Sequence, residues 1–595
     1  MAVVPHSTPD PVKRRGKRVP PAPAKHAHAS FSSGVNRRPT QPLVASTAAS
    51  LTQVAVRGSA SCTIDRRFES ALLLTKPFIP PRFQMSSRIF APLYYLLEYL
   101  RICLQWAIVL FIAMPLSTLY DIFFAMRNKL VYSLGTAPRA HNRKVMAIQR
   151  QVHNWSENCR RTKMCPVSSG WFKVFRPTSQ NGITYIQTGV LMDILEVDTR
   201  RLAVRVEPMV TMSQLCQALI PLGYCLPILP GWPDLTVQDA INSCGVAASG
   251  RKYGLFQHIC LSYELVMPDG SLVVASKEKN GDAETQALFY GVPWSAGTLG
   301  ILVAATLRII PVKPFVKVTY APTNSIEEMQ SKLTEECNCR ENEFVEGLQL
   351  SREAGVVMRG RFSEGPPKNF SFDINRIGRW YKPWFYTHIE TMSSDNEFTE
   401  FIPLQAYYQR YTRHLYWELK DLLPFGNRFL FRWLLGWMSA PKSEILKAAL
   451  PEFMSSKMSQ KRTMQDLLVP MEHLPEIVDV CDMETQIYPL WLCPYNQPSC
   501  PGIVRQRSGR NVLFVNVGVY GVAKKSNFHP KISIRRLEEA VRSLNGVRIM
   551  RADTQMSRSE FWQMFDSSLY EWLRVKYNCK EAFADVYDKV SPAVY

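Results

Sequence analysis

The chain has 595 residues, of which 46% are hydrophobic and 11% aromatic, and this length predicts two large domains or three to four smaller units. Its formal net charge of +21 suits anionic lipid headgroups and phosphorylated cofactors as well as nucleic acid, but no nucleic-acid-binding motif accompanies it, so we expect no nucleic-acid partner. Fourteen cysteines without a CxxC pair argue against a zinc site, so we expect no metal.

Residues 1–84 form a basic tail. Residues 1–67 carry eleven Lys and Arg against Asp10 and Asp65, and the segment shows no sustained apolar period. Such a segment cannot bury enough surface to offset its ordering entropy, which predicts a disordered tail. An organelle transit peptide and a chain that really starts at Met85 are the alternatives.

Residues 85–135 predict a membrane anchor. Ile102–Tyr120 is an uncharged stretch of 19 residues, and the apolar residues after Asp121 extend it to about 102–126. At about 1.5 Å per residue, this length matches a hydrocarbon core of about 30 Å. Pro115 predicts a kink, and an interfacial or re-entrant helix is the alternative. Basic residues after the stretch favour a cytoplasmic C-terminal side.

Residues 140–315 alternate short strands with helices. Strands are predicted at Ile194–Asp198, around Leu202–Val206, and at Ile301–Pro311. A hairpin is predicted from Leu261–Met267 through a Pro-Asp-Gly turn to Ser271–Ala275.

Two capped helices are predicted in the same region. Thr211 and Gln214 form a capping box that opens a helix over Leu215–Leu222, with Gly223 at its C-terminal end. Thr236 opens a second, short helix that leads to Gly245. The layout is that of an α+β nucleotide-binding domain, and no GxGxxG follows a strand, so a Rossmann site is not indicated.

Residues 316–595 are predicted to be mixed α+β and rich in aromatic residues. The runs Trp380–Tyr386 and Tyr407–Arg413 stand out. Such clusters are more often part of a core than of a cofactor site, but a large apolar ligand needs aromatic walls with few polar anchors.

Several runs of the chain resemble Δ24-sterol reductases over roughly residues 90–595. Each run is weakly specific by itself, whereas their order and spacing are very specific. They are LMDILEVDTRRLAVRVEPMVTMSQ (191–214), RKYGLFQHICLSYELVMPDGSLV (251–273), VPWSAGTLGILVAATLRIIPVK (292–313), FVEGLQLS (344–351), WYKPWF (380–385), IPLQAYYQRYTRHLYWEL (402–419), YPLWLCP (488–494) and SEFWQMFDSSLYEWLR (559–574).

The resemblance implies a fold and an activity. The expected fold is α+β: an FAD-binding domain of the vanillyl-alcohol-oxidase (PCMH) type over 140–315, a C-terminal substrate domain over 316–595, and one N-terminal transmembrane helix. The implied activity is reduction of the Δ24 side-chain double bond of a sterol, at position 24(25) or 24(28), with FAD as cofactor and NADPH as electron donor. The implied setting is single-pass attachment to the endoplasmic reticulum membrane, with a cytoplasmic catalytic domain and possible homo-oligomers.

The resemblance also implies which residues meet the flavin. Small residues let backbone N–H groups surround a diphosphate without Cβ clashes. The positions are Ser168, Ser169, Gly170, Trp171, Thr236, Val237, Gly245, Tyr253, Gly254, Ser295, Gly297, Thr298 and Gly300.

The sequence departs from the family at two places. Val167-Ser168-Ser169-Gly170 stands where relatives carry Gly-Arg-Pro-Gly, and Gln238-Asp239 stands where they carry Gly-Gly. The lost arginine removes a charge-assisted phosphate contact of about 1.5–3 kcal/mol, which the two serine hydroxyls replace in part. Asp239 either repels phosphate, if it points inward, or faces solvent.

Reduction of an isolated alkene requires a general acid beside the hydride donor. The candidate acids are Tyr520, Tyr408 and Glu346, followed by His414 and Glu418, with packing or surface roles as the alternatives. Arg410 and Arg413 are candidates to anchor the NADPH phosphate, although an ion pair is the commoner role for a buried arginine.

Two other functions stay open at this point. One is a flavin oxidase or dehydrogenase of the same superfamily that acts on another lipid. The other is a flavin-poor membrane scaffold, which the altered phosphate loops would suit.

Overall fold

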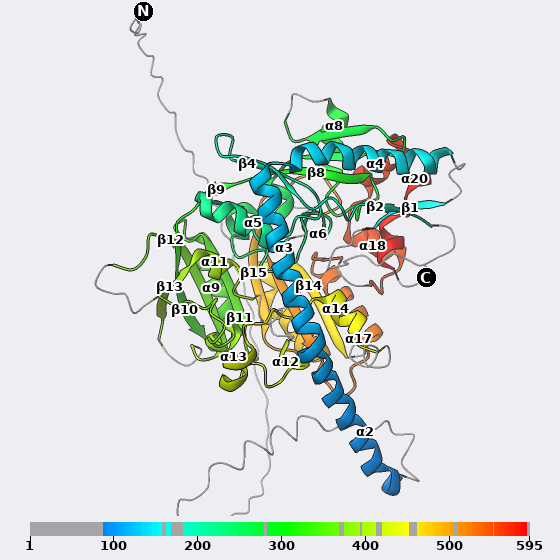
Figure 1. The fold of residues 1–595 in the computed structure, drawn as a ribbon. Coiled ribbons are helices and arrows are strands. Elements are labelled where there is room, and N and C mark those ends of the chain that lie inside the picture. Colours follow the sequence, from blue (N-terminus) through cyan, green and yellow to red (C-terminus); the bar gives the residue numbers. More distant parts are fainter. Residues whose placement is uncertain are drawn as a thin grey trace, which may run out of the picture. The chain divides into compact units, whose positions relative to one another are not determined.

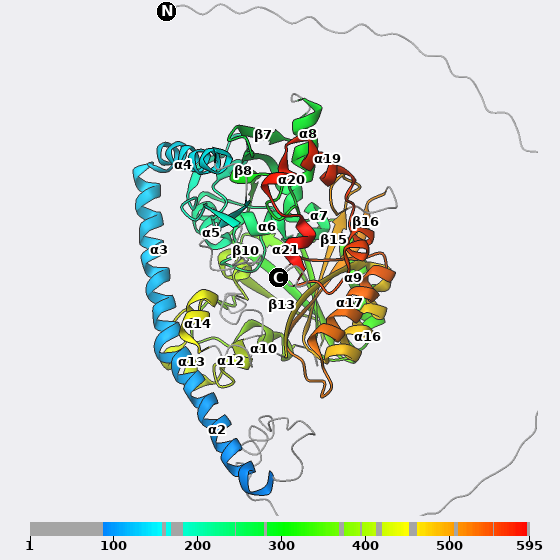
Figure 2. The same cartoon turned by 90° about the vertical axis from the view of Figure 1, so that its right-hand side faces the viewer.

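The computed structural model describes residues 87–157, 162–167, 183–243, 245–278, 282–367, 374–392, 396–411, 419–451, 461–504, 510–550 and 553–591. The predicted tail and Ser168–Trp171 of the predicted flavin loop lie outside these residues, as do Arg413, His414 and Glu418. Figures 1 and 2 show two sheets with their helices and a long N-terminal helix that runs along one side of both.

The long N-terminal helix consists of α2 (Ser87–Ile108), a π-helical turn (Val109–Ala113) and α3 (Met114–Leu134). The π turn immediately precedes Pro115, whose ring removes a backbone donor and crowds the preceding turn, and a locally widened helix accommodates both effects. Gly135, at φ +58°, ends the helix, and the chain turns into α4 (Ala137–Glu157). Leu96–Leu134 is long and apolar enough to cross a membrane.

This helix does not stand free of the rest of the protein. Asp193 lies between Arg127 of α3 and Lys144 of α4, and Lys144 Nζ is also 2.7 Å from Glu207 Oε2. Burial alone would raise the pKa of Asp193, but its hydrogen bonds to Arg127 and Lys144 lower it. His141 Nδ1 lies 2.9 Å from Glu207 Oε1 in the same buried cluster. The cluster fixes both helices to the neighbouring sheet.

That neighbouring sheet has five antiparallel strands in the order β3-β4-β8-β6-β7. They are β3 (Ile194–Asp198), β4 (Ala203–Val206), β8 (Ile301–Arg308), β6 (Cys260–Val266) and β7 (Leu272–Ser276). The predicted strands and the hairpin are therefore confirmed. The central strand β8 is almost wholly apolar and buried, as its position between β4 and β6 requires.

Two further strand pairs and several short helices complete this part. The strands are the parallel pair β1 (Lys163–Val167) and β2 (Ile183–Gln187), and the antiparallel pair β5 (Tyr224–Cys225) and β9 (Ile310–Pro311). The helices are α5 (Met212–Leu219), a 3₁₀ turn (Ile220–Leu222), α6 (Val237–Asn242), α7 (Gly250–Tyr253), a 3₁₀ turn (Phe256–Ile259) and α8 (Ala283–Gly291).

Both predicted helix starts are confirmed. Thr211 and Gln214 form the reciprocal capping box of α5, and Gly223 closes the following turn at φ +82°. Thr236 caps α6 by accepting a hydrogen bond from the backbone N–H of Asp239.

The second sheet has eight strands in the order β13-β10-β12-β11-β15-β16-β14-β17. They are β13 (Phe398–Pro403), β10 (Phe315–Thr323), β12 (Gly355–Ser363), β11 (Phe344–Gln349), β15 (Leu490–Gln497), β16 (Val512–Val522), β14 (Arg462–Pro470) and β17 (Val547–Arg548). One face is covered by α9 (Ile326–Asn338), α16 (Leu474–Thr485) and α17 (Pro530–Ser543). Gly347 of β11 turns toward α9, where a Cβ would lie 2.9 Å from Met329.

Shorter helices border the other face and the N-terminal helix. They are α10 (Phe385–Glu390), α11 (Leu404–Tyr408), α12 (Leu419–Leu422), α13 (Phe429–Leu435) and α14 (Ser443–Ala449). A 3₁₀ turn (Met471–His473) precedes α16 and contacts α9. The aromatic runs divide between core and surface. Trp384, Phe385, Tyr407 and Tyr408 are buried, whereas Tyr381 is exposed.

The C-terminal segment returns to the first sheet. It contains α18 (Arg558–Met564), α19 (Ser568–Lys576), α20 (Cys579–Ala582) and α21 (Val586–Val590). Phe583 bridges to Met164 of β1, and Leu573 lies so close to Gly291 of α8 that a Cβ there would be 2.1 Å from it. Figure 1 shows this red segment beside β1 and β2. Residues 558–590 therefore pack against the part of the chain that the sequence predicts to bind FAD.

Candidate active site

The first of the predicted flavin segments that the structure describes is the short helix α6 with the loop after it. Thr236 Oγ1 donates to Asp239 Oδ2 at 2.7 Å while it accepts from the Asp239 backbone N–H at 3.1 Å. Asp239 is buried, so the expectation that it faces solvent is wrong; its carboxylate is turned back onto the helix start. Val237 is fully buried and packs in the core.

Two glycines let the chain pass close to its neighbours after α6. A Cβ on Gly245 would lie 2.8 Å from Phe256 Cβ, and one on Gly250 would lie 2.8 Å from Tyr495 Cβ of β15. Gly254 follows at φ +79°, and the Tyr253 hydroxyl donates to Glu343 at 2.7 Å. The segment is therefore packed closely against its neighbours, including β15 of the eight-stranded sheet, and only glycine fits at these two positions.

The second predicted flavin segment is the loop before β8. Trp294, Ala296 and Gly297 all have positive φ, which few residues other than glycine adopt. Ser295 Oγ donates to Val292 O, and Thr298 Oγ1 lies 2.7 Å from both Ser295 O and the Tyr570 hydroxyl. The N–H groups of Trp294, Ser295 and Thr298 donate to backbone carbonyls of Ile241, Val292 and Ser295, so the N–H groups of this turn that suit a phosphate or a flavin carbonyl are those of Ala296 and Gly297. Gly300 continues the loop at φ +143°.

Basic side chains from the C-terminal segment reach this loop. Lys589 Nζ donates to Ala296 O at 3.0 Å, and Arg574 donates to Thr298 O, Phe583 O and Ala584 O. Burial, together with the Arg574 charge, lowers the pKa of Lys589. Gly297, in the same loop, lies next to Pro166 of β1: a Cβ on Gly297 would be 3.7 Å from the Pro166 side chain. The loop and the two basic residues that contact it therefore lie beside β1, the strand that precedes the predicted flavin positions Ser168–Trp171.

Sequence reasoning did not find Lys589 or Arg574. Arg574 ends one of the runs that resemble the family, but lysine and arginine so far from the loop in sequence carry no signal of their own. Their positive charge and the small-residue loops fit an anionic dinucleotide.

The opposite wall of the site is the face of the eight-stranded sheet that its long helices leave uncovered. Directly paired residues on neighbouring strands share a face, so Leu348, Trp491, Gly518 and Asp466 of four neighbouring strands point to the same side of the sheet. Residues two positions away along a strand share that face, and together they form one polar row. Its members are Glu346, Trp491, Asn516, Asp466 and Tyr520.

Glu346 and Arg410 form a buried ion pair in this row. Arg410 Nη2 lies 2.6 Å from Glu346 Oε1, and the Trp491 indole N–H donates to Glu346 Oε2 at 2.9 Å. Burial alone would lower the pKa of Arg410, but the Glu346 carboxylate raises it well above its usual value. Both oxygens of Glu346 thus accept hydrogen bonds from buried donors.

Tyr520 and Asp466 form the second polar contact of the row. The Tyr520 hydroxyl donates to Asp466 Oδ1, which also accepts from Asn516 Nδ2 at 3.1 Å. The Tyr520 phenol lies over Gly518 of the same strand. A Cβ on Gly518 would be 2.6 Å from the Tyr520 hydroxyl, so only glycine leaves room for the phenol there.

Tyr408 lies beside a small cavity between the two walls. The cavity, of about 10 Å³, is bounded by Ala247–Ser249 on one side and by Phe344, Arg410 and Trp491 on the other. Burial and two neighbouring thiols, Cys225 and Cys216, raise the pKa of Tyr408 well above its usual value. The phenol therefore keeps its proton.

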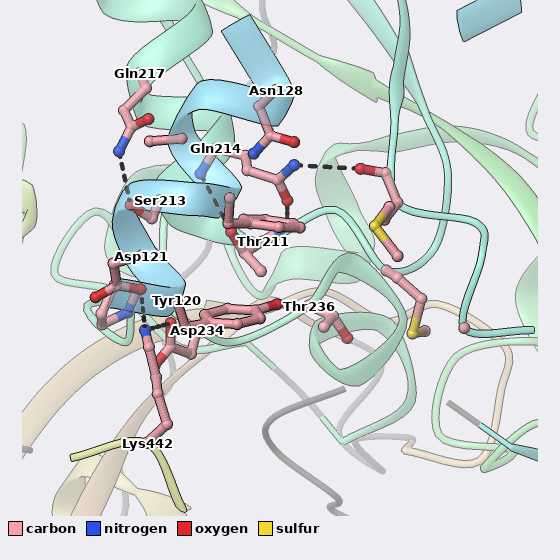
Figure 3. A pocket seen from close by; sticks show the side chains of 16 residues that line it. Tyr120, Asp121, Asn128, Thr211, Ser213, Gln214, Gln217, Asp234, Thr236 and Lys442 are labelled. Atoms are coloured by element: carbon pink, nitrogen blue, oxygen red, sulfur yellow. Dashed lines mark hydrogen bonds and ion pairs between the residues drawn. The ribbon is translucent and has the colours of Figure 1, made fainter. Parts of the chain in front are cut away.

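A larger cavity, of about 220 Å³, lies between α3 and helix α5 with the loops around it (Figure 3). Tyr120, Asp121 and Asn128 line it from the N-terminal helix, and Thr211 and Thr236 line it from the other side. At its edge Lys442 Nζ lies 2.9 Å from Asp121 and 2.6 Å from Asp234. The N-terminal helix and the segment around Thr236 thus line the same cavity.

Comparison with known proteins agrees with this geometry. A family model described as an FAD binding domain matches residues 158–276. A Delta(24)-sterol reductase homolog of Caenorhabditis elegans is 43% identical over 502 residues, which cover 83% of this chain and 95% of the relative. The human Delta(24)-sterol reductase is 43% identical over 500 residues (84% and 95%), and that of Pisum sativum is 33% identical over 518 residues (82% and 90%).

Proposed function

This chain belongs to the Delta(24)-sterol reductase family, and we propose that it reduces the Δ24 side-chain double bond of a sterol, at 24(25) or 24(28), with electrons that NADPH supplies through FAD. It is an oxidoreductase with an FAD-binding domain.

One observation carries the proposal: the small-residue loops of the FAD-binding part lie directly against the polar face of the eight-stranded sheet. The backbone N–H of Val345 donates to Ala248 O at 2.8 Å, and α7 packs on β15 through Gly250. A flavin held by these loops is therefore next to the polar row and the buried aromatic residues around it. Aromatic walls with few polar groups suit a sterol side chain.

The chemistry divides between cofactor and protein. Bound FAD, reduced by NADPH, would supply the hydride that one alkene carbon accepts. An unactivated alkene accepts hydride poorly, so the other carbon must take up a proton as charge develops, and exclusion of water strengthens that step.

Tyr520 is our choice as the proton donor. Both carboxylate oxygens of Glu346 already accept hydrogen bonds, from Arg410 and from Trp491, and the Tyr408 hydroxyl faces thiols that cannot easily return a proton. Tyr520 alone among the three hydrogen-bonds a carboxyl group, Asp466. After Tyr520 gives its proton to carbon, the tyrosinate would regain a proton through Asp466, its hydrogen-bond partner.

The setting belongs to the same proposal. The helix Leu96–Leu134 supports attachment to a bilayer, which is where sterols reside. The basic residues after it support a cytoplasmic catalytic part on the endoplasmic reticulum membrane. Homo-oligomers stay a prediction.

The test uses the full chain in detergent. Flavin absorbance is recorded, NADPH and desmosterol are added without oxygen, and the sterol is analysed by mass spectrometry. Bleaching of the flavin, followed by its recovery as the sterol gains two hydrogens, is the expected result. Bleaching without sterol turnover would point to another lipid acceptor, and a protein that binds no FAD would refute the enzymatic function.

A further inference from the structure

The segment 425–442 lies beside the most apolar part of the N-terminal helix. The backbone N–H groups of Ser439 and Lys442 donate to Thr118 Oγ1 and Ser117 Oγ, each at 2.9 Å. Phe425 packs edge-on against Trp106, with ring centroids 5.1 Å apart. These contacts span the uncharged stretch, so whatever medium surrounds that stretch also surrounds this segment.

The helix α13, in the middle of this segment, exposes an apolar surface. Its seven residues contain one charged residue, Arg432, and none of them is buried. Leu430 is 67% exposed and Trp433 52%. With the neighbouring Trp437, which is 60% exposed, this surface is too apolar to be an ordinary water-facing helix. The exposed members are Phe429, Leu430, Trp433, Leu434 and Trp437.

The apolar surface of α13 continues that of the N-terminal helix. Figure 2 shows α13 beside the lower half of that helix, and Phe425 and Ser439, which flank α13 in the sequence, contact Trp106 and Thr118 of the helix. Phe111, Leu119 and Phe123 of the helix are 78%, 62% and 67% exposed. The two surfaces together are one apolar region with two helical elements.

Aromatic and basic residues border this region. Trp380 and Tyr381 pack on Trp433, at centroid distances of 5.3 and 6.2 Å. Residues 374–385 and 424–442 contain no Asp or Glu, but they contain Arg376, Arg379, Lys382, Arg428, Arg432 and Lys442. Tryptophan and tyrosine beside lysine and arginine are typical of surfaces at the boundary between hydrocarbon and anionic headgroups.

We propose that α13, through Phe429, Leu430, Trp433, Leu434 and Trp437, is a second membrane-contacting element that enters the same leaflet as the outer face of the N-terminal helix. The occupant of this surface is a bilayer with anionic headgroups. The inference rests on the proposed attachment of the N-terminal helix to a bilayer and goes beyond it. In this arrangement one face of the N-terminal helix packs on the protein and the opposite face contacts lipid, so the helix is not the only element that contacts the membrane.

Backbone and charge requirements agree with this placement. Backbone N–H groups in an apolar medium need partners, and Ser117 and Thr118 supply them for Lys442 and Ser439. The Lys442 ammonium is compensated by Asp121 and Asp234. A cavity of about 390 Å³ lined by Trp380, Trp437 and Lys442 opens on the same side.

The test is photo-crosslinking of the full chain in vesicles of phosphatidylcholine, with or without phosphatidylserine. The photoreactive residue p-benzoylphenylalanine is placed singly at Trp433, at Leu119 of the N-terminal helix, or at Trp572 of α19, whose 46% exposure matches that of Trp433. We expect phospholipid adducts, identified by mass spectrometry, at Trp433 and Leu119 and none at Trp572. The yield at Trp433 should rise with phosphatidylserine, and the double substitution Arg376→Gln with Arg428→Gln should remove that rise.

The other outcomes separate the two proposals. Adducts at Leu119 without adducts at Trp433 would overturn the role of α13 and leave the attached helix intact. Absence of adducts at both positions would overturn membrane attachment itself. Adducts from Trp433 to a second copy of the chain or to another protein would show a protein interface and would also overturn the proposal.

Discussion

The hydroxyl of Ser117 accepts a hydrogen bond from the backbone N–H of Lys442 at 2.9 Å, although the two residues are 325 positions apart. One turn further along the same helix, Asp121 lies 2.9 Å from the Lys442 ammonium. The N-terminal helix is thereby part of the folded unit and not a separate tether.

Lys442→Met should destabilise this junction. The substitution leaves Asp121 (39% exposed) and Asp234 (24% exposed) without their shared buried cation, and because both carboxylates reach solvent the cost should lie between the ~0–1 kcal/mol of an exposed pair and the ~3–5 kcal/mol of a fully buried one. The midpoint of thermal unfolding in detergent should fall, and α3 should become cleavable by protease. Lys576→Met is the control because it breaks only the exposed pair with Glu284, which contributes about 0–1 kcal/mol. Equal effects of the two variants would contradict the junction.

Glu346→Gln should leave Arg410 buried without a counterion. A loss of about 3–5 kcal/mol in the free energy of unfolding is expected, measured in urea. The double variant Glu346→Met with Arg410→Met should recover much of that loss, because two apolar side chains replace two desolvated charges. If the double variant is as unstable as the single one, the pair is not what stabilises this face.

Tyr520→Phe should slow sterol reduction by about 100-fold or more, since a positioned general acid contributes about 10²–10⁴-fold. FAD content and flavin bleaching by NADPH should be unchanged, because the hydroxyl donates to Asp466 of β14, a residue outside the predicted flavin segments. Tyr408→Phe is the matched variant, with an expected effect below tenfold. Single-turnover rates measured in H₂O and D₂O separate proton transfer from binding; a reversed order of the two variants would move the acid to Tyr408.

Lys589→Met should weaken FAD binding by about 10-fold or more, the equivalent of losing one charge-assisted contact of about 1.5–3 kcal/mol. The affinity of the apoprotein is measured by quenching of flavin fluorescence. Lys580→Met, on the exposed neighbouring helix, is the control.

Lys589 also gives FAD binding a pH dependence. Burial lowers its pKa, and a phosphate group binds only the protonated form, so affinity should fall as the pH rises through that lowered value. The slope should vanish in Lys589→Met. A slope that persists in the variant would assign the dependence to another group.

His258 should make the protein less stable in mild acid. Burial lowers its pKa to about 4, and its Nδ1 accepts from the Leu255 backbone N–H. Between pH of about 6.5 and 4 the unfolded chain binds a proton that the folded chain refuses, so stability falls as the pH falls, by roughly 3 kcal/mol in total. Denaturant midpoints at several pH values measure this, and His258→Gln should flatten the profile across that window.

The local elements of the FAD-binding part followed from sequence alone. The capping box at Thr211, the helix start at Thr236 and the hairpin around Gly270 each depend on residues only a few positions apart, and the structure confirms all three. The family also followed from sequence, because the order of many short runs is specific even where each run is not.

Contacts between distant segments were decided only by the tertiary structure. The pairing of Glu346 with Arg410 and the hydrogen bond from Lys589 to Ala296 each join residues whose neighbours in sequence give no sign of the contact. The same holds for the N-terminal helix. Its apolar composition predicts an affinity for lipid, but which face meets lipid depends on Ser117, Thr118 and Asp121 finding partners more than 100 residues away, since burial and pairing are properties of the packed chain.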